Sequence, residues 1–205
     1  MHAKPTPQKS FKMKNPKFNP INFDPQNGNF TNLHLLADVA DLLYSNRFEL
    51  FDSFFQLNEE NKIQKTIELV QHTAPAFWAI TNPQNGELAG VAYLYDWIGS
   101  SEKCYSVKVS TCFARKYWGG FTHRAGKLFL RYIFAKYAPT RLCAEVYASN
   151  PYPKRLLEKL GFHYEFTKPN ATLSKGRPVS VLGYSAENPR TQNPSKSAKT
   201  ATSSN

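Results

Sequence analysis

The feature that most constrains this chain is the turn Tyr117-Trp118-Gly119-Gly120-Phe121, which separates a strand pattern from a helix pattern. Asn150 follows 29 residues after Phe121, and Gly161-Phe162 comes eleven positions after Asn150. Between these marks lie a helical pattern, a short apolar strand pattern and a second helical pattern. A glycine turn that leads into a helix exposes unpaired N–H groups and a partial positive charge. Such a corner suits a phosphate-bearing ligand.

Length and composition predict one globular domain with two flexible basic tails. The chain has 205 residues, 41% of them hydrophobic, which is enough for one domain with a substantial core. Residues 1–20 carry five lysines and residues 188–205 carry three basic residues, and neither segment has an acid. The tails therefore hold most of the net charge of +11. They are poor in branched aliphatic residues, which predicts flexibility. The domain proper is expected over residues 21–187.

The basic tails have two readings, as solvated segments that aid solubility or as sites of weak contact with nucleic acid or another polyanion. The three cysteines Cys104, Cys112 and Cys143 are too few and too scattered for a disulfide framework or a zinc site, so no metal is expected. The sequence has no apolar run of about 18 residues and no signal peptide. We therefore expect a cytoplasmic protein without a membrane partner.

Hydrophobic periodicity predicts an α+β domain. Helices are predicted at about 33–46, 58–72, 122–137 and 153–160, and strands at 76–81, 87–97, 104–113, 141–147, 162–166 and 178–184. A short extended piece is expected near 18–23. The Asn85-Gly86 pair before an apolar run is a strong hairpin signal. Asn58 is the expected N-cap of the second helix, with Ile63 and Val70 on its inward side.

This order of elements resembles the GCN5-related N-acetyltransferase (GNAT) family over roughly residues 30–185. Three local matches carry the resemblance: Glu87-Leu88-Ala89-Gly90-Val91 after Asn85-Gly86, then Tyr117-Trp118-Gly119, then Asn150 with Gly161-Phe162. The last two are closest to the branch that acetylates ribosomal-protein N-termini. The resemblance implies a mixed, mostly antiparallel central sheet flanked by about four helices. Its fourth and fifth strands, 104–113 and 141–147, would splay apart.

The resemblance also implies acetyl-coenzyme A (acetyl-CoA) as co-substrate, bound between the splayed strands. Backbone groups of Thr111, Cys112 and Phe113 would pair with the pantetheine arm, and one N–H there would hold the developing oxyanion. The pyrophosphate would lie against the turn and the helix start, a set formed by Gly119, Gly120, Phe121, Thr122, His123 and Arg124. Asn150 would bond the cofactor from the end of the fifth strand.

The chain departs from the family pattern in three places. Its glycine loop is one residue short, Leu157 stands where many members have a tyrosine that acts as general acid, and Pro153 replaces a serine. A base must also take a proton from the attacking amine. Asp96 and Glu102 are the nearest acids in the sequence, although each also reads as a solvated loop residue.

Three functions remain open. The first is an acetyl-CoA-dependent N-acetyltransferase that acts directly on a primary amine, which is a protein N-terminus, a small amine or an aminoacyl-tRNA. The second is a non-catalytic protein that keeps the fold for binding or assembly, and it predicts a cleft filled by Phe113, Phe121 or Leu157. The third is nucleic-acid binding through the tails, which no aromatic–basic motif in the domain supports. The oligomeric state is not predicted.

Overall fold

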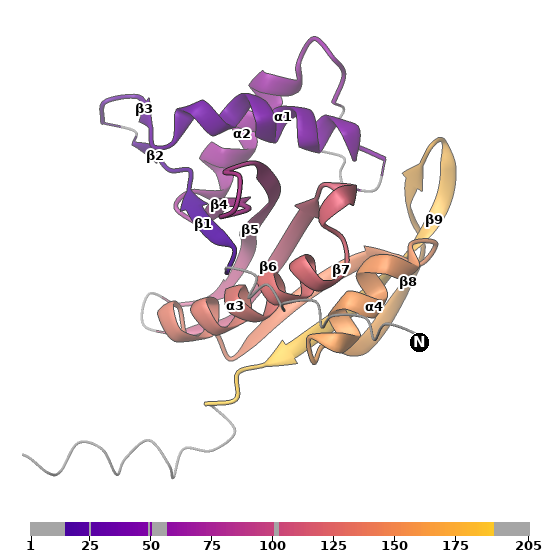
Figure 1. The fold of residues 1–205 in the computed structure, drawn as a ribbon. Helices are drawn as coiled ribbons and strands as arrows, with labels where there is room; N and C mark the ends of the chain where they lie inside the picture. The colour runs from indigo at the N-terminus through magenta and orange to yellow at the C-terminus, as the bar shows by residue number, and fades with distance from the viewer. Residues whose placement is uncertain (1–14, 25, 49, 51–56, 101–102, 191–205) are drawn as a thin grey trace, which may run out of the picture.

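The computed structural model describes residues 15–24, 26–48, 50, 57–100 and 103–190 (Figure 1). Within them the chain forms a seven-stranded sheet and a two-stranded ribbon. The α-helices are α1 (Leu36–Ser45), α2 (Lys62–Thr73), α3 (Gly120–Lys136) and α4 (Pro151–Lys159). The sheet contains β1 (Lys17–Pro20), β4 (Phe77–Thr81), β5 (Leu88–Gly99), β6 (Cys104–Phe113), β7 (Arg141–Tyr147), β8 (His163–Ser174) and β9 (Arg177–Glu187). The ribbon joins β2 (Phe23–Asp24) to β3 (Asn29–Phe30), and η1 (Leu33–Leu35) and η2 (Arg115–Tyr117) are 3-10 turns.

The sheet has the strand order β1-β4-β5-β6-β7-β9-β8, and every neighbouring pair is antiparallel except β6 with β7. The parallel pair is short, because it begins at Ser106↔Arg141 and ends at Lys108↔Cys143. Beyond Lys108 the two strands continue without pairing to each other. The predicted α+β architecture and its mostly antiparallel sheet with two parted strands are therefore confirmed.

Two core layers sandwich the sheet (Figure 1). Helices α3 and α4 cover one face, where Phe129, Ile133 and Leu157 pack against inward residues of β6, β7 and β9. Helices α1 and α2 cover the other face over β4 and β5. Strand alternation places Val146 of β7 in the α3/α4 layer, so the neighbouring Glu145 points to the opposite face.

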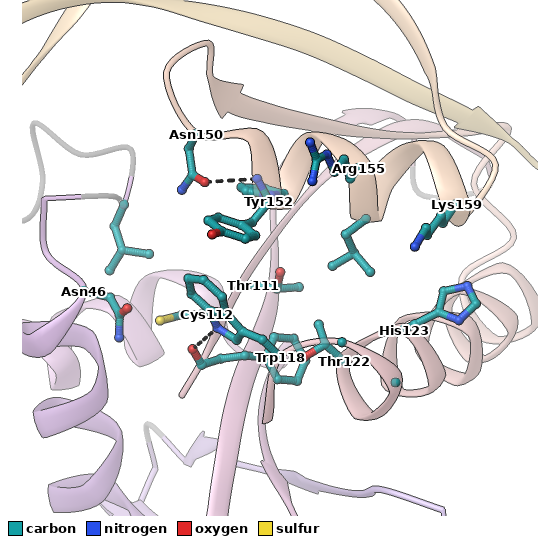
Figure 2. A pocket seen from close by; sticks show the side chains of 16 residues that line it. Asn46, Thr111, Cys112, Trp118, Thr122, His123, Asn150, Tyr152, Arg155 and Lys159 are labelled. Atoms are coloured by element: carbon teal, nitrogen blue, oxygen red, sulfur yellow. Dashed lines mark hydrogen bonds between the residues drawn. The ribbon is translucent and has the colours of Figure 1, made fainter. Parts of the chain in front are cut away.

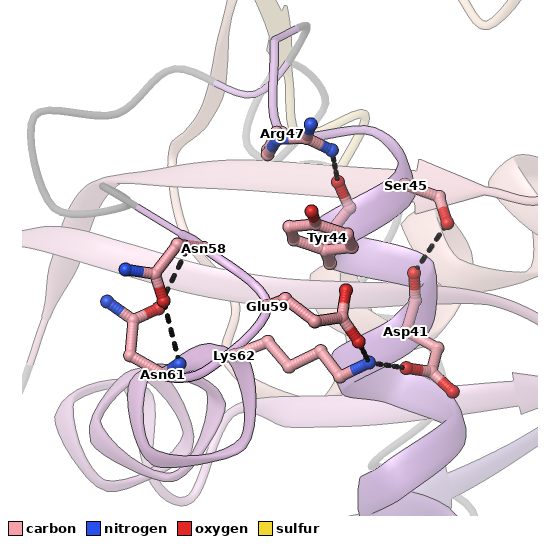
Figure 3. A network of polar contacts seen from close by, with 8 residues as sticks. All are labelled: Asp41, Tyr44, Ser45, Arg47, Asn58, Glu59, Asn61 and Lys62. Atoms are coloured by element: carbon pink, nitrogen blue, oxygen red, sulfur yellow. Dashed lines mark hydrogen bonds and ion pairs between the residues drawn. The ribbon is translucent and has the colours of Figure 1, made fainter.

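The second helix begins later than predicted. Asn58 and Asn61 each accept a hydrogen bond from the backbone N–H of the other, at 2.8 and 2.9 Å (Figure 3). This reciprocal pairing closes a turn, so α2 begins at Lys62. Val70 is buried as predicted, but Ile63 in the first turn is exposed, and the prediction for Ile63 was wrong.

Lys62 then joins the two helices that form the α1/α2 layer. Its Nζ lies 2.7 Å from Asp41 of α1 and also bonds Glu59 (Figure 3). The hydrogen bonds to Asp41 and Glu59 raise the pKa of Lys62 above its ordinary value despite some desolvation.

The last two strands are longer than 162–166 and 178–184. They form one hairpin whose two-residue turn, Lys175-Gly176, has φ of 50° and 73°. Two positive φ values match the twist of a hairpin, and this allows the strands to run to the turn. A bulge between Lys168 and Thr172 breaks the pairing. At the tip, Ser174 Oγ donates a hydrogen bond of 2.8 Å to the Phe48 carbonyl, so the hairpin reaches the chain after α1.

The folded part extends past both boundaries expected from the sequence. Strand β1 lies within the predicted N-terminal tail and pairs with β4. At the other end, Asn188 is buried and its side chain donates a 3.0 Å hydrogen bond to the Pro139 carbonyl. The remainder of the predicted tails, residues 1–14 and 191–205, lies outside the described residues. Of the helices described, none has the length and apolar character needed to cross a membrane.

A pair of matched leucine substitutions tests the position of the core. Leu142 on β7 is fully buried beneath α3 and α4, whereas Leu173 near the hairpin tip is 65% exposed. Leu142→Ala should lower the free energy of unfolding by about 2–5 kcal/mol because it removes buried methyl groups and leaves a cavity. Leu173→Ala should change it by less than about 0.5 kcal/mol. Urea unfolding measures both, and equal losses would contradict this core.

Candidate functional site

A cavity of about 600 Å³ opens where β6 and β7 part (Figure 2). Its walls come from the end of β6, the following loop, the first turn of α3, the whole length of α4 and the chain after α1. The lining residues are Asn46, Leu50, Thr111, Cys112, Phe113, Trp118, Gly119, Gly120, Thr122, His123, Asn150, Tyr152, Pro153, Arg155, Leu156 and Lys159.

The lining comes from both faces of the sheet. His123 and Arg155 belong to α3 and α4, which cover one face. Asn46 and Leu50 follow α1, and Cys112 packs in the α1/α2 layer on the other face. The cavity therefore passes between the strands and does not merely lie on one face.

Aromatic side chains hold the glycine loop in place. The Trp118 indole N–H donates a 3.0 Å hydrogen bond to the Phe113 carbonyl at the end of β6. The Tyr117 hydroxyl donates a 2.8 Å bond to Glu87 on the β4–β5 turn. Lys116 also pairs with Glu87, and hydrogen bonds from Lys116 and then Tyr117 lower the pKa of that carboxyl. The aromatic part of the motif is thus a support for the loop.

The two glycines have different roles. Gly119 has φ of 94°, a conformation that side chains rarely adopt, and it precedes the first residue of α3. Gly120 is the first residue of α3, and a Cβ at Gly120 would meet no atom within 4 Å. The N–H groups of the first turn of α3 have no acceptor inside the helix. They and the helix dipole favour an anion in this part of the cavity.

His123 adds an unpaired polar atom to the same wall. Its Nε2 is buried, and no hydrogen-bond partner is found for it within the part of the chain that the structure describes. Thr122, the residue before it, instead donates its hydroxyl to the Tyr117 carbonyl at 2.8 Å. The imidazole therefore offers a hydrogen-bonding group that a bound ligand can satisfy.

Helix α4 supplies the opposite wall. Asn150 Oδ1 accepts a 3.2 Å hydrogen bond from the Tyr152 N–H, so Asn150 caps this helix (Figure 2). The rings of Tyr152 and Trp118 approach across the cavity, with centroids 4.9 Å apart. Arg155 and Lys159 also line the cavity and bring two positive charges. Sequence reasoning missed both cations, although their i, i+4 spacing on one helix face was a usable signal.

Most of the residues predicted for the cofactor site are brought together. Eight of them line the cavity: Thr111, Cys112, Phe113, Gly119, Gly120, Thr122, His123 and Asn150. Phe121 does not line it, because its ring lies 5.0 Å from that of Tyr117 and packs against the core. Arg124 lies one residue beyond His123 in α3 and is likewise outside the lining.

A smaller cavity of about 110 Å³ lies deeper between the strands and shares Thr111 and Asn150 with the first. Its wall includes Glu145 of β7, whose side chain is only 16% exposed. Glu145 Oε1 lies 2.9 Å from Lys168 Nζ and 3.4 Å from Lys108 Nζ. Among the described acids, Glu145 is the one that lines either cavity.

Asp96, one of the two acids proposed from the sequence, does not occupy that position. Asp96 is on β5, does not line either cavity, and lies 2.9 Å from Lys108. Burial lowers the pKa of Lys108, but the hydrogen bond to Asp96 and the charge of Glu145 outweigh it, so that pKa lies above its ordinary value. Glu102 lies outside the described residues. Glu145 was missed, although an acid within the apolar pattern of the 141–147 strand was a visible signal.

Solved structures with a similar fold include three acetyltransferases. A GNAT-family acetyltransferase from Bacillus anthracis has 14% identity and a TM-score of 0.66, covering 86% of this chain and 97% of that one. The ribosomal-protein-S5-alanine acetyltransferase from Vibrio fischeri has 16% identity and a TM-score of 0.65, covering 89% and 98%. Spermidine N-acetyltransferase from Vibrio cholerae, in complex with CoA and spermine, has 16% identity and a TM-score of 0.67, covering 84% and 95%.

At these identities the likeness to solved structures shows the fold alone. No curated protein matches the chain in sequence. A family model described as the acetyltransferase (GNAT) domain, however, matches residues 35–163, which is more than half of the chain. The chain therefore belongs to the GNAT family, and its folded part is an acetyltransferase domain.

Proposed function

We propose that the protein is an acetyl-CoA-dependent N-acetyltransferase that transfers an acetyl group directly to a primary amine. The observation that carries the proposal is one continuous arrangement: an anion-binding helix start, a cavity between parted strands, and a carboxylate at its inner end. The acceptor is a protein N-terminus, a small amine or an aminoacyl-tRNA. The similar structure that holds CoA and spermine supports both the co-substrate and an amine acceptor.

The residues of α3 and α4 that line the larger cavity fit the phosphates of CoA. The first turn of α3, beginning at Gly120, offers N–H groups without an acceptor inside the helix, and His123 offers Nε2, which has no partner among the described residues. Arg155 and Lys159 face them from α4 with two positive charges. Charge-assisted hydrogen bonds of this kind are the strong ones in anion recognition. The loop that is one residue short in sequence thus still leads into a helix start that lines the cavity.

The edge of β6 that faces β7 fits the pantetheine arm. From Val109 to Phe113 the strand pairs with β5 on one side, and among the described residues no strand pairs with it on the side of β7. Acetyl-CoA supplies the acetyl group as an activated thioester. A backbone N–H on this edge can hold the negative charge that develops on the carbonyl oxygen, which is the usual source of electrostatic stabilisation in acyl transfer.

Glu145 is the proposed base. Its carboxylate takes one proton from the acceptor's ammonium group, which frees the nitrogen lone pair for attack on the thioester carbon. A C–N bond forms and the C–S bond breaks, so the electron pair of the C–S bond leaves on sulfur. The second N–H proton balances the thiolate, and Glu145 returns its own proton to solvent. Leu157, where a tyrosine acid was looked for, lies in the core and has no role in these steps.

The shape of the cavity weighs against a closed, non-catalytic fold. That alternative requires Phe113, Phe121 or Leu157 to fill the space between the strands. Phe113 lines the space instead, Phe121 turns away toward Tyr117, and Leu157 packs in the core and lines only the smaller cavity. A volume of about 600 Å³ remains.

Gly120→Leu tests the cofactor site. The new side chain would project into the cavity, where nothing lies within 4 Å of its Cβ, and would block the helix start. Calorimetry should show acetyl-CoA binding weakened by about 100-fold or more, since several charge-assisted hydrogen bonds are lost together. Gly120→Ala is the matched control and should retain most of the affinity. Wild-type affinity in the leucine variant, with an unchanged melting temperature, would contradict the placement.

Glu145→Gln tests the base while preserving size and hydrogen bonding. The turnover number should fall by about 100-fold or more, the range of general base catalysis, with acetyl-CoA affinity unchanged. Glu158→Gln, on the exposed side of α4, is the control and should retain full turnover. Steady-state release of free thiol with an accepted amine measures both. A glutamine variant as fast as the wild type would remove Glu145 from the reaction.

A further inference from the structure

This inference rests on the proposed function. The lysines around Glu145 indicate which acceptor fits beside the base. Lys168 of β8 and Lys108 of β6 approach the same carboxylate oxygen, Oε1, at 2.9 and 3.4 Å. Within the described residues, the hydrogen bonds and ion pairs of Glu145 all use Oε1. Oε2 is therefore the oxygen that remains for the acceptor's amine.

The charges beside the base are balanced before any acceptor arrives. Asp96 lies 2.9 Å from Lys108, so each of the two described acids in this cluster already has a lysine partner. A polyamine would bring further positive charges next to Lys108 and Lys168. Like charges placed together cost several kcal/mol, roughly, in a recognition site. This arrangement disfavours polycationic acceptors.

More positive charge lies where the β8–β9 hairpin meets the chain after α1. The Arg47 guanidinium is 4.4 Å and the Lys175 ammonium 5.8 Å from the centre of the Phe48 ring. The Ser174–Phe48 hydrogen bond fixes this junction. Since α1 covers the face of the sheet to which Glu145 points, the described cations border the same side as the base.

The two lysines that pair with Glu145 differ in exposure and in their number of ion-pair partners. Lys108 is 30% exposed and is held by Asp96 as well as Glu145, whereas Lys168 is 51% exposed and has Glu145 as its ion-pair partner. Lys168 also comes from the strand segment just before the bulge of the hairpin. It can therefore turn toward an incoming anion while Lys108 stays in place.

We propose that the acceptor is a primary amine with a carboxylate close beside it, for which an α-amino acid is the simplest example. The amine lies at Glu145 Oε2, and the carboxylate binds the Lys168 ammonium through a charge-assisted hydrogen bond. Lys168 is thus a specificity-determining residue for the acceptor. An acidic residue at a peptide N-terminus offers the same chemistry as a free amino acid.

The test compares two pairs of acceptors, each with and without the anion, and adds one polyamine. L-alanine, L-alaninamide, spermidine and the tripeptide amides Asp-Ala-Ala and Ala-Ala-Ala are acetylated by the full-length protein, with rates expressed per free amine. We expect kcat/KM for L-alanine to exceed that for L-alaninamide by about tenfold or more, as for a hydrogen-bonded charge pair. Preference for Asp-Ala-Ala over Ala-Ala-Ala, with L-alanine poor, would identify the peptide as the source of the same carboxylate.

Substitutions of Lys168 test its proposed role in binding the acceptor. Lys168→Met should raise KM for L-alanine about tenfold more than KM for L-alaninamide, so that the preference for the carboxylate is lost, while Lys168→Arg should restore the preference. Lys154→Met, on the exposed side of α4, is the control. Calorimetry of L-alanine into the CoA complex should show the same loss without turnover.

The outcomes separate this inference from the proposed function. Equal rates for L-alanine and L-alaninamide, together with equal rates for the two tripeptides, would overturn the carboxylate requirement while leaving the transferase intact. A preference for spermidine would do the same. Absence of acetylation for all five acceptors, with acetyl-CoA still bound, would overturn the transferase and this inference with it.

Discussion

The parting of β6 and β7 after Lys108 is the constraint on which the rest of the site depends. Each strand keeps its outer partner to the end, since β6 pairs with β5 as far as Phe113 and β7 pairs with β9 as far as Tyr147. Only the edges of β6 and β7 that face each other separate. Backbone groups left without a strand partner require another one, from solvent or a ligand. The two halves of the sheet are therefore firmly held, and the gap between them is a fixed feature of the fold.

The sequence allowed the architecture and the start of α3 at the cavity to be predicted, because both depend on repeated or local patterns. Alternation defined the strands, and the glycine turn marked the start of α3. The hairpin of β8 and β9 was cut short in prediction because Pro169 and Asn170 interrupt the strand pattern, whereas the structure accommodates them in a bulge. The late start of α2 depends on a mutual contact between Asn58 and Asn61, which spacing alone does not reveal.

The inner end of the site was predicted less well for a different reason. Glu145 becomes important through its neighbours, Lys108 and Lys168, which come from β6 and β8. These contacts join residues far apart in the chain, so they require the strand order and the register to be known. Asp96 was chosen by proximity along the sequence, and in the fold it holds Lys108. A motif therefore located the helix start, while the acid and its partners required the three-dimensional sheet.

The cavity is lined from both faces of the sheet, with His123 and Arg155 on one side and Asn46 and Leu50 on the other. A passage through a sheet has two entrances. For a reaction of two substrates, each can then enter and leave by its own route without waiting for the other. Such a geometry favours a ternary complex and direct transfer over a ping-pong mechanism with a covalent acetyl-enzyme intermediate. The buried Cys112 on the wall packs in the α1/α2 layer, and under the proposed function the shape of the passage predicts a sequential kinetic order.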